Sequence, residues 1–292
     1  MKRLIFIFVA IQFLTLSAFG FEDNTFLPEN NLSIPVNAKI SGGISQAEFN
    51  KVIDDVEKVF SSVVEDAGGE LKINRKWDDG TVNAYATRKG DTWSISMFGG
   101  LARHQTITMD GMYLVVCHEL GHHLGGAPKL ASNPYSYEDQ TWASNEGQSD
   151  YYAVTKCLRK VWDSADNASA IKDLQIPKVL QDGCKKAKRN DPKDTALCVR
   201  MGMAGKSVSN LFSVLGSLPE TKFETPDQNV VSKTDDRHPK AQCRLDTYFQ
   251  GAMCDSGVNE ELSDTDENKG VCSAFNGDRI GNRPACWFKP SR

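Results

Sequence analysis

Apolar residues recur at helical spacing between Phe49 and Val64, which predicts an amphipathic helix. Ser45 and Glu48 have the spacing of a capping box at its start, and Gly68-Gly69 marks its end. Three strand-like runs follow, with turn residues between them. We expect these strands at 71–77, 81–88 and 92–98.

After these strands the apolar residues return to helical spacing. We expect helices at about 106–124, from 144 or 145 to 162, and at 177–188, 194–216 and 239–253, with a polar linker at 217–236. A helix, a small sheet and further helices form an α+β pattern. We therefore expect an extended N-terminal segment at 21–44, one α+β domain with a small three-stranded sheet at 45–254, and a disulfide-rich tail at 255–292.

The first twenty residues read as a secretory signal peptide. Lys2 and Arg3 precede an apolar run, and small residues indicate cleavage after Gly20. The alternative is an uncleaved anchor, although the run is short and polar for a membrane span. No later run is long enough to cross a membrane. We therefore expect a periplasmic or secreted protein without stable membrane insertion after signal removal.

Composition and charge narrow the classes of protein and of partner. The 292 residues are 40% hydrophobic and 25% charged, which is typical of a folded protein. The formal net charge is −4 and the sequence has no basic stripe, so we expect no nucleic-acid partner. The oligomeric state cannot be read from the sequence.

Eight cysteines follow the signal peptide, and an even number in an exported chain predicts up to four disulfides. Eight cysteines allow about 105 pairings. Proximity alone suggests Cys184 with Cys198 and Cys272 with Cys286. Metal binding by thiolates is the less favoured alternative, because the chain has no C-x-x-C pair.

The segment His118-Glu119-Leu120-Gly121-His122 lies in a predicted helix. A spacing of four residues puts both imidazoles on one helix face, where they can bind one zinc ion. Glu119 can then act on a zinc-activated water as a general base. Two ordinary helix histidines remain the alternative.

The next helix begins with two carboxylates four residues apart. Glu146 can complete a site of two histidines and one glutamate, which leaves a coordination position open, as catalytic zinc requires. Asp150 can hydrogen-bond the outer nitrogen of one ligand histidine. Taken alone, the two acids fit equally well as solvated groups in a first helical turn.

Only two other positions in the chain attract a catalytic assignment. His238 precedes a helix that starts with proline, and it can donate to the oxyanion of an attacked carbonyl, with Arg244 adding positive charge. A helix turn with a surface salt bridge explains them as well. His123 points away from the proposed metal, so we place it behind the site or on the surface, and we place His104 on the surface.

Together these motifs resemble the gluzincin zinc metallopeptidases, the group that includes HtpX, BepA and the CAAX-prenyl endopeptidases. The group has HExxH on one helix, ExxxD on the next and a late His-Pro followed by Arg. Here these are residues 118–122, residues 146–150, and His238-Pro239 with Arg244. Residues 82–86, Val-Asn-Ala-Tyr-Ala, are similar to its Asn-Ala-Phe-Ala segment.

The resemblance covers about 80–250 and implies a zincin-like domain that binds one Zn²⁺. It implies His118, His122 and Glu146 as ligands, Glu119 as base, and His238 and Arg244 at the transition state. It also implies that one strand binds the substrate backbone by β-addition. That strand comprises Trp93, Ser94, Ile95, Ser96 and Met97.

Two features depart from this family. The acidic motif is usually Glu-Phe-x-Ala-Asp, whereas this chain has Gly147 and Ser149. Its cysteine-containing tail has no counterpart that we can place.

The expected function is an exported zinc endopeptidase acting on unfolded or envelope proteins. A silent peptidase-like protein that binds or assembles envelope proteins is the alternative. A third possibility is an enzyme kept latent by the 127–143 loop or by the tail. A structural zinc site fits least, because such sites prefer four protein ligands.

Overall fold

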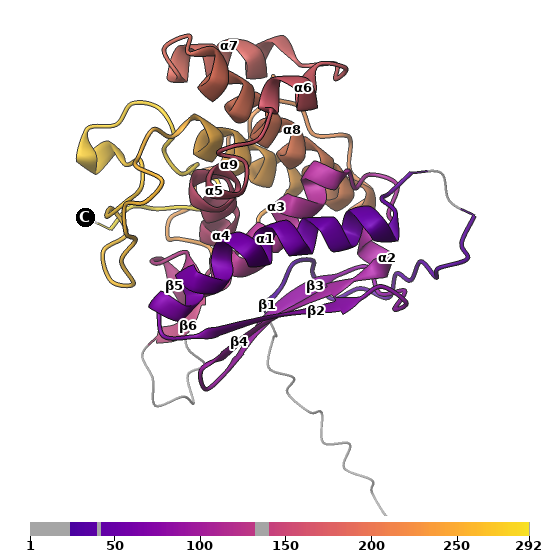
Figure 1. Cartoon of the computed structure of the whole chain (residues 1–292). Helices are drawn as coiled ribbons and strands as arrows, with labels where there is room; N and C mark the ends of the chain where they lie inside the picture. Colours follow the sequence, from indigo (N-terminus) through magenta and orange to yellow (C-terminus); the bar gives the residue numbers. More distant parts are fainter. Residues whose placement is uncertain (1–23, 40–41, 132–139, 292) are drawn as a thin grey trace, which may run out of the picture.

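The computed structural model describes residues 24–39, 42–131 and 140–291 (Figure 1). The predicted signal peptide, residues 1–20, lies outside the described residues. The described part is an α+β structure, as predicted. None of the helices in these ranges is both long and apolar enough to cross a membrane.

The main sheet has the strand order β1-β3-β4-β2. The predicted strands are confirmed as β2 (Glu70–Lys76), β3 (Ala84–Lys89) and β4 (Thr92–Phe98). β4 pairs in parallel with β2 on one side and antiparallel with β3 on the other. A short strand that the sequence pattern did not predict, β1 (Asn24–Thr25), pairs antiparallel with β3.

Helix α1 (Gln46–Asp66) runs along one face of this sheet (Figure 1). The predicted capping box is present: the Ser45 side chain accepts from the Glu48 backbone, and the Glu48 side chain accepts from the Ser45 backbone. The apolar face of α1 is buried in the core through Phe49, Val52, Ile53, Val56, Phe60 and Val64.

The central helices carry the histidine motif and the acidic motif. α2 (Gly99–Ala102) leads into α3 (Met109–Leu124), which is followed by a hairpin of β5 (Lys129–Ala131) and β6 (Gln140–Ser144) where we expected a loop. The predicted helix from 144 or 145 to 162 is three joined pieces. These are α4 (Glu146–Tyr152), a π-helical turn η1 (Ala153–Cys157) and α5 (Leu158–Val161).

The remaining predicted helices are confirmed to within a few residues as α7 (Lys178–Ala187), α8 (Pro192–Leu215) and α9 (Ala241–Met253). A short helix α6 (Asn167–Ile171) was not predicted. Residues 217–236 contain no helix or strand, as expected for the linker. Helix α8 packs between α3 and α9 and so connects the two parts of the chain that form the site.

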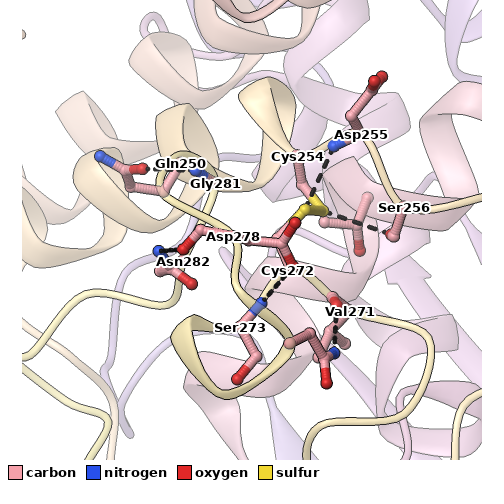
Figure 2. Close-up of a disulfide and its surroundings, with 12 residues drawn as sticks. Gln250, Cys254, Asp255, Ser256, Val271, Cys272, Ser273, Asp278, Gly281 and Asn282 are labelled. Carbon is pink, nitrogen blue, oxygen red and sulfur yellow. Dashed lines mark hydrogen bonds between the residues drawn. A yellow bond between two sulfur atoms is a disulfide. The ribbon is translucent and has the colours of Figure 1, made fainter.

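Four disulfides join the eight cysteines: Cys117–Cys157, Cys184–Cys198, Cys243–Cys286 and Cys254–Cys272. The pair of Cys184 with Cys198 is confirmed, whereas the pair of Cys272 with Cys286 is wrong. Each of these two tail cysteines bonds instead to a cysteine of α9 or at its end. Figure 2 shows Cys254–Cys272, where the backbone N–H of Asp255 also donates to the Cys272 sulfur. The tail, with its single helical turn η2 (Ala274–Asn276), is therefore held against α9.

Candidate metal centre

Helix α3 presents His118, Glu119 and His122, and none of these side chains has any exposed surface. The side chain of Thr108 caps the helix by accepting from the backbone of Gly111. The two imidazole rings are perpendicular, with centroids 4.8 Å apart. The i, i+4 spacing therefore produces the shared helix face that the sequence predicted.

Helix α4 brings Glu146 to the same point. Asn145 caps this helix by accepting from the backbone of Gln148, which places Glu146 in the first turn. Its two carboxylate oxygens lie 3.3 Å from His118 Nε2 and 3.5 Å from His122 Nε2. The ligand atoms of the three residues all lie within 4.8 Å of one another. His118, His122 and Glu146 thus form a buried group that can hold a metal ion.

The unpaired atoms of this group fit a cation. Buried polar atoms in proteins almost always have a hydrogen-bond partner. Nevertheless, Nε2 of His118, Nε2 of His122 and one Glu146 oxygen are buried without one, and so are both oxygens of Glu119. These atoms gather where a metal and its bound groups would satisfy them.

The outer nitrogens of the two histidines are fixed by acceptors. His118 Nδ1 lies 2.7 Å from Asp150 Oδ1, and His122 Nδ1 lies 2.9 Å from the carbonyl oxygen of Ser144. A carboxylate and a carbonyl can only accept here, so each Nδ1 carries the proton. Nε2 is then the free donor of electrons to a metal.

Charge in the site is distributed unevenly. Burial alone disfavours a proton on both ligand histidines, and it lowers the pKa of His122 to about 4. Beside His118 the carboxylates of Asp150 and Glu146 outweigh burial and raise the pKa to about 9. Burial raises the pKa of Glu119 well above its ordinary value. Glu119 is thus a carboxyl group with increased affinity for a proton.

Glu146 favours its ionised form. Burial opposes its charge, but the neighbouring His238, His118 and His122 outweigh burial and hold the pKa of Glu146 below its ordinary value. A carboxylate beside two imidazoles is a suitable donor set for a divalent ion.

Residues from α9 and the loop before it complete the group. His238 Nε2 lies 3.5 Å from Glu146 Oε2, and Arg244 Nη1 lies 3.8 Å from the same oxygen. Arg244 is fully buried and pairs with Asp150. The structure therefore brings seven predicted site residues, from α3, α4, α9 and the loop before α9, into one cluster, although 126 positions separate His118 from Arg244.

The predicted substrate strand is not available for β-addition. β4 lies inside the sheet, with β2 and β3 paired along both of its edges, so no further strand can join it. Our prediction for this strand is therefore wrong in the role that it assigned to Trp93, Ser94, Ile95, Ser96 and Met97. Ile95 and Met97 also have no exposed surface.

The structure also decides the places of the two other histidines. His104 is buried, with its Nδ1 3.0 Å from Thr106 Oγ1, so its surface assignment is wrong. For His123 we left two places open, and the structure excludes the surface: the residue is buried, and its ring stacks with those of Trp93 and Trp142. It does not belong to the group of possible metal ligands.

Sequence reasoning missed several contributors. Tyr248 donates to Asp150 across 2.7 Å, and its position four residues after Arg244 on one helix could have indicated this. Ser144 acts through its backbone carbonyl, for which a sequence carries no signal. The Thr25 carbonyl oxygen lies 2.7 Å from His238 Nε2, and the ring of Phe26 meets that of His118 edge to face. These contacts depend on strand pairing, so they could not be predicted from the sequence either.

Comparison of the chain with protein-family models, with curated proteins and with solved structures gives no match.

Proposed function

We propose that the protein is an exported, gluzincin-type zinc endopeptidase with a zincin-like domain. One observation carries this proposal. The metal-facing atoms of His118, His122 and Glu146 converge without partners, and the equally unpartnered carboxylate of Glu119 lies beside them. A structural metal site would have no use for this additional buried acid.

The donor set favours zinc. Two imidazoles and one carboxylate are typical of catalytic zinc sites, which keep a position open. The eight cysteines are all in disulfides, so no thiolate competes for the ion. A zinc ion bound by these three residues would supply Lewis-acid chemistry, polarising a peptide carbonyl and making a water molecule more acidic.

Glu119 is the general base and acid in this proposal. It takes a proton from the attacking water and later delivers it to the leaving amine, so that water is added across the C–N bond. Its raised pKa favours uptake of that proton. His238 donates to the carbonyl oxygen at which negative charge develops. Arg244 holds a neighbouring main-chain carbonyl.

Two further observations support the proposed substrate and compartment. His238 and Arg244 both donate to main-chain carbonyl groups in this structure, which supports a polypeptide substrate. Four disulfides are typical of an oxidising compartment. We therefore assign the protein to the periplasm or the extracellular medium, with unfolded or envelope proteins as substrates.

The test compares the chain from residue 21, oxidised and loaded with one zinc, with Glu119→Gln and Glu146→Gln. We expect slow cleavage of casein by the parent and a loss of at least about 100-fold in Glu119→Gln, because proton transfer is lost. Glu119→Gln should keep one zinc, whereas Glu146→Gln should bind zinc more weakly. Mass spectrometry of the fragments and zinc analysis measure both. Equal cleavage by parent and Glu119→Gln would exclude this mechanism.

A further inference from the structure

Residues 24–27 lie along the edge of the sheet that faces the metal centre. Asn24 and Thr25 pair antiparallel with Ala86 and Tyr85 of β3. The Phe26 N–H then donates to the Ala84 carbonyl across 2.9 Å. This is the arrangement by which an extended peptide joins the edge of a sheet.

The side chain of Asn83 extends the same pairing by one residue. Its Oδ1 accepts from the Leu27 N–H across 2.9 Å, and its Nδ2 donates to the Leu27 carbonyl across 3.2 Å. An amide side chain thus replaces the next backbone partner. The edge of β3 therefore holds the backbone of the segment through its polar groups, which any extended peptide offers.

Two consecutive carbonyl groups of this segment point at the catalytic cluster. His238 Nε2 lies 2.7 Å from the Thr25 carbonyl oxygen, and Arg244 Nη1 donates to the Phe26 carbonyl across 3.1 Å. The same His238 nitrogen lies 3.5 Å from the ligand oxygen of Glu146. The peptide bond between Thr25 and Phe26 therefore lies beside the metal centre.

The side chain of Phe26 fills the space next to a metal ligand. It has no exposed surface, and its ring meets the rings of His118 and Phe212 edge to face at 5.0 and 5.4 Å. The Arg244 guanidinium lies 4.8 Å from its centroid. This environment suits a large apolar side chain.

With the segment in place the centre is closed to solvent. His118, Glu119 and His122 have no exposed surface, and Glu146 is only 4% exposed. A substrate polypeptide would need the two donors, His238 and Arg244, that the segment already occupies. An incoming chain and residues 24–27 therefore exclude each other.

We infer that residues 24–27 are bound as an internal substrate analogue, with the Thr25 carbonyl in the position of the carbonyl of the bond that is cut. This inference rests on the proposed function and deepens it. The site takes an extended polypeptide with a large apolar residue directly after the cleaved bond. The enzyme is latent until the segment leaves the edge of β3.

The first experiment uses the zinc-loaded chain from residue 21 with Phe26→Ala. Phe49→Ala is the matched control, because Phe49 is equally buried but lies on α1. A tethered ligand acts at an effective concentration on the order of 1 mM, so loosening it should raise kcat/KM on casein at least about tenfold. Phe49→Ala should give no increase, and Phe26→Leu should give an increase smaller than that of Phe26→Ala.

A second measurement does not depend on hydrolysis. The probe is the fluorescent tetrapeptide Asn-Thr-Phe-Leu, blocked at both ends, added to zinc-loaded Glu119→Gln chains. We expect it to bind the chain that also carries Phe26→Ala at least about tenfold more tightly than the chain that does not, because the internal competitor is weakened. Phe49→Ala in the same background should bind no more tightly than Glu119→Gln alone.

The outcomes separate this inference from the proposed function. Equal cleavage and equal probe binding by the parent, Phe26→Ala and Phe49→Ala would overturn the inference and leave the peptidase intact. Selective probe binding by the chain that carries Phe26→Ala, with no casein cleavage by the parent or by Phe26→Ala, would support residues 24–27 as the occupant of the peptide site and overturn the peptidase. Should Phe26→Ala fail to fold, Phe26→Leu takes its place in the probe experiment. Two results together would then overturn the inference. The chain with Phe26→Leu would bind the probe no more tightly than Glu119→Gln alone at every probe concentration, and the probe would not inhibit casein cleavage by the parent.

Discussion

Asp150 connects the metal ligands to the groups that contact the peptide. Its Oδ1 accepts from His118, Arg244 and Tyr248. The carboxylate orients the ring of His118 and also compensates the charge of Arg244, which has no exposed surface. A buried guanidinium without such a partner is strongly destabilising.

We expect Asp150→Asn to weaken zinc binding about 10- to 100-fold, because an amide orients His118 less firmly and makes it a poorer donor. Competition with a chromophoric chelator measures this affinity. Tyr248→Phe is the control: it removes one hydrogen bond to Asp150 but keeps the carboxylate, so its zinc affinity should remain near that of the parent. Indistinguishable affinities for all three proteins would show that Asp150 does not position the ligand.

At the scale of elements, the tail forms part of the support of α4. The Trp287 ring packs directly on Gly147, and its Nε1 donates to Thr247 of α9 across 3.0 Å. Arg283 donates to the side chain of Gln148 across 3.1 Å. The tail therefore occupies the space beside the helix that carries Glu146, which explains why a glycine follows this glutamate here.

A methyl group at Gly147 would lie only 2.3 Å from the Trp287 ring. We expect Gly147→Ala to lower the free energy of unfolding by about 1–3 kcal/mol, since overpacking forces the two elements apart. In the background of Trp287→Leu the same substitution should cost much less, because the two residues are in direct contact. Urea unfolding of the four proteins measures this coupling, and additive losses would contradict it.

At the scale of the whole molecule, the buried His104 links stability to pH. Burial lowers the pKa of this ring below its ordinary value of 6.5. In the unfolded chain the ring takes up a proton below about pH 6.5, whereas the folded chain keeps it neutral to lower pH. The unfolded state then binds more protons, so the free energy of unfolding falls as the pH falls through this range. Above about pH 6.5 His104 contributes no pH dependence to the free energy of unfolding.

We expect His104→Asn to reduce this dependence while keeping an acceptor for the Thr106 N–H. The free energy of unfolding of the variant should fall less steeply than that of the parent as the pH falls below about 6.5. Urea unfolding of the metal-free proteins over this range measures both slopes. Parallel curves would show that His104 titrates alike in both states.

The amino-acid sequence is sufficient to predict the features that depend on neighbours along the chain. Helix α1 follows from its apolar spacing and its capping box, and the shared face of His118 and His122 follows from the helix period. The i, i+4 spacing of Glu146 and Asp150 likewise places their side chains on one face of a helix. In each case a few consecutive backbone angles fix the geometry, so local preferences suffice.

The contacts between distant segments became known only from the folded structure. The sequence pattern identified the strand at 92–98 but not its place between β2 and β3, and proximity assigned Cys272 to the wrong partner. The sequence pattern also gave no sign that Thr25 and Phe26 would contact His238 and Arg244, which lie more than two hundred residues away. Such contacts depend on the packing of the complete core and on competition among many possible strand neighbours, which no local pattern in the sequence encodes.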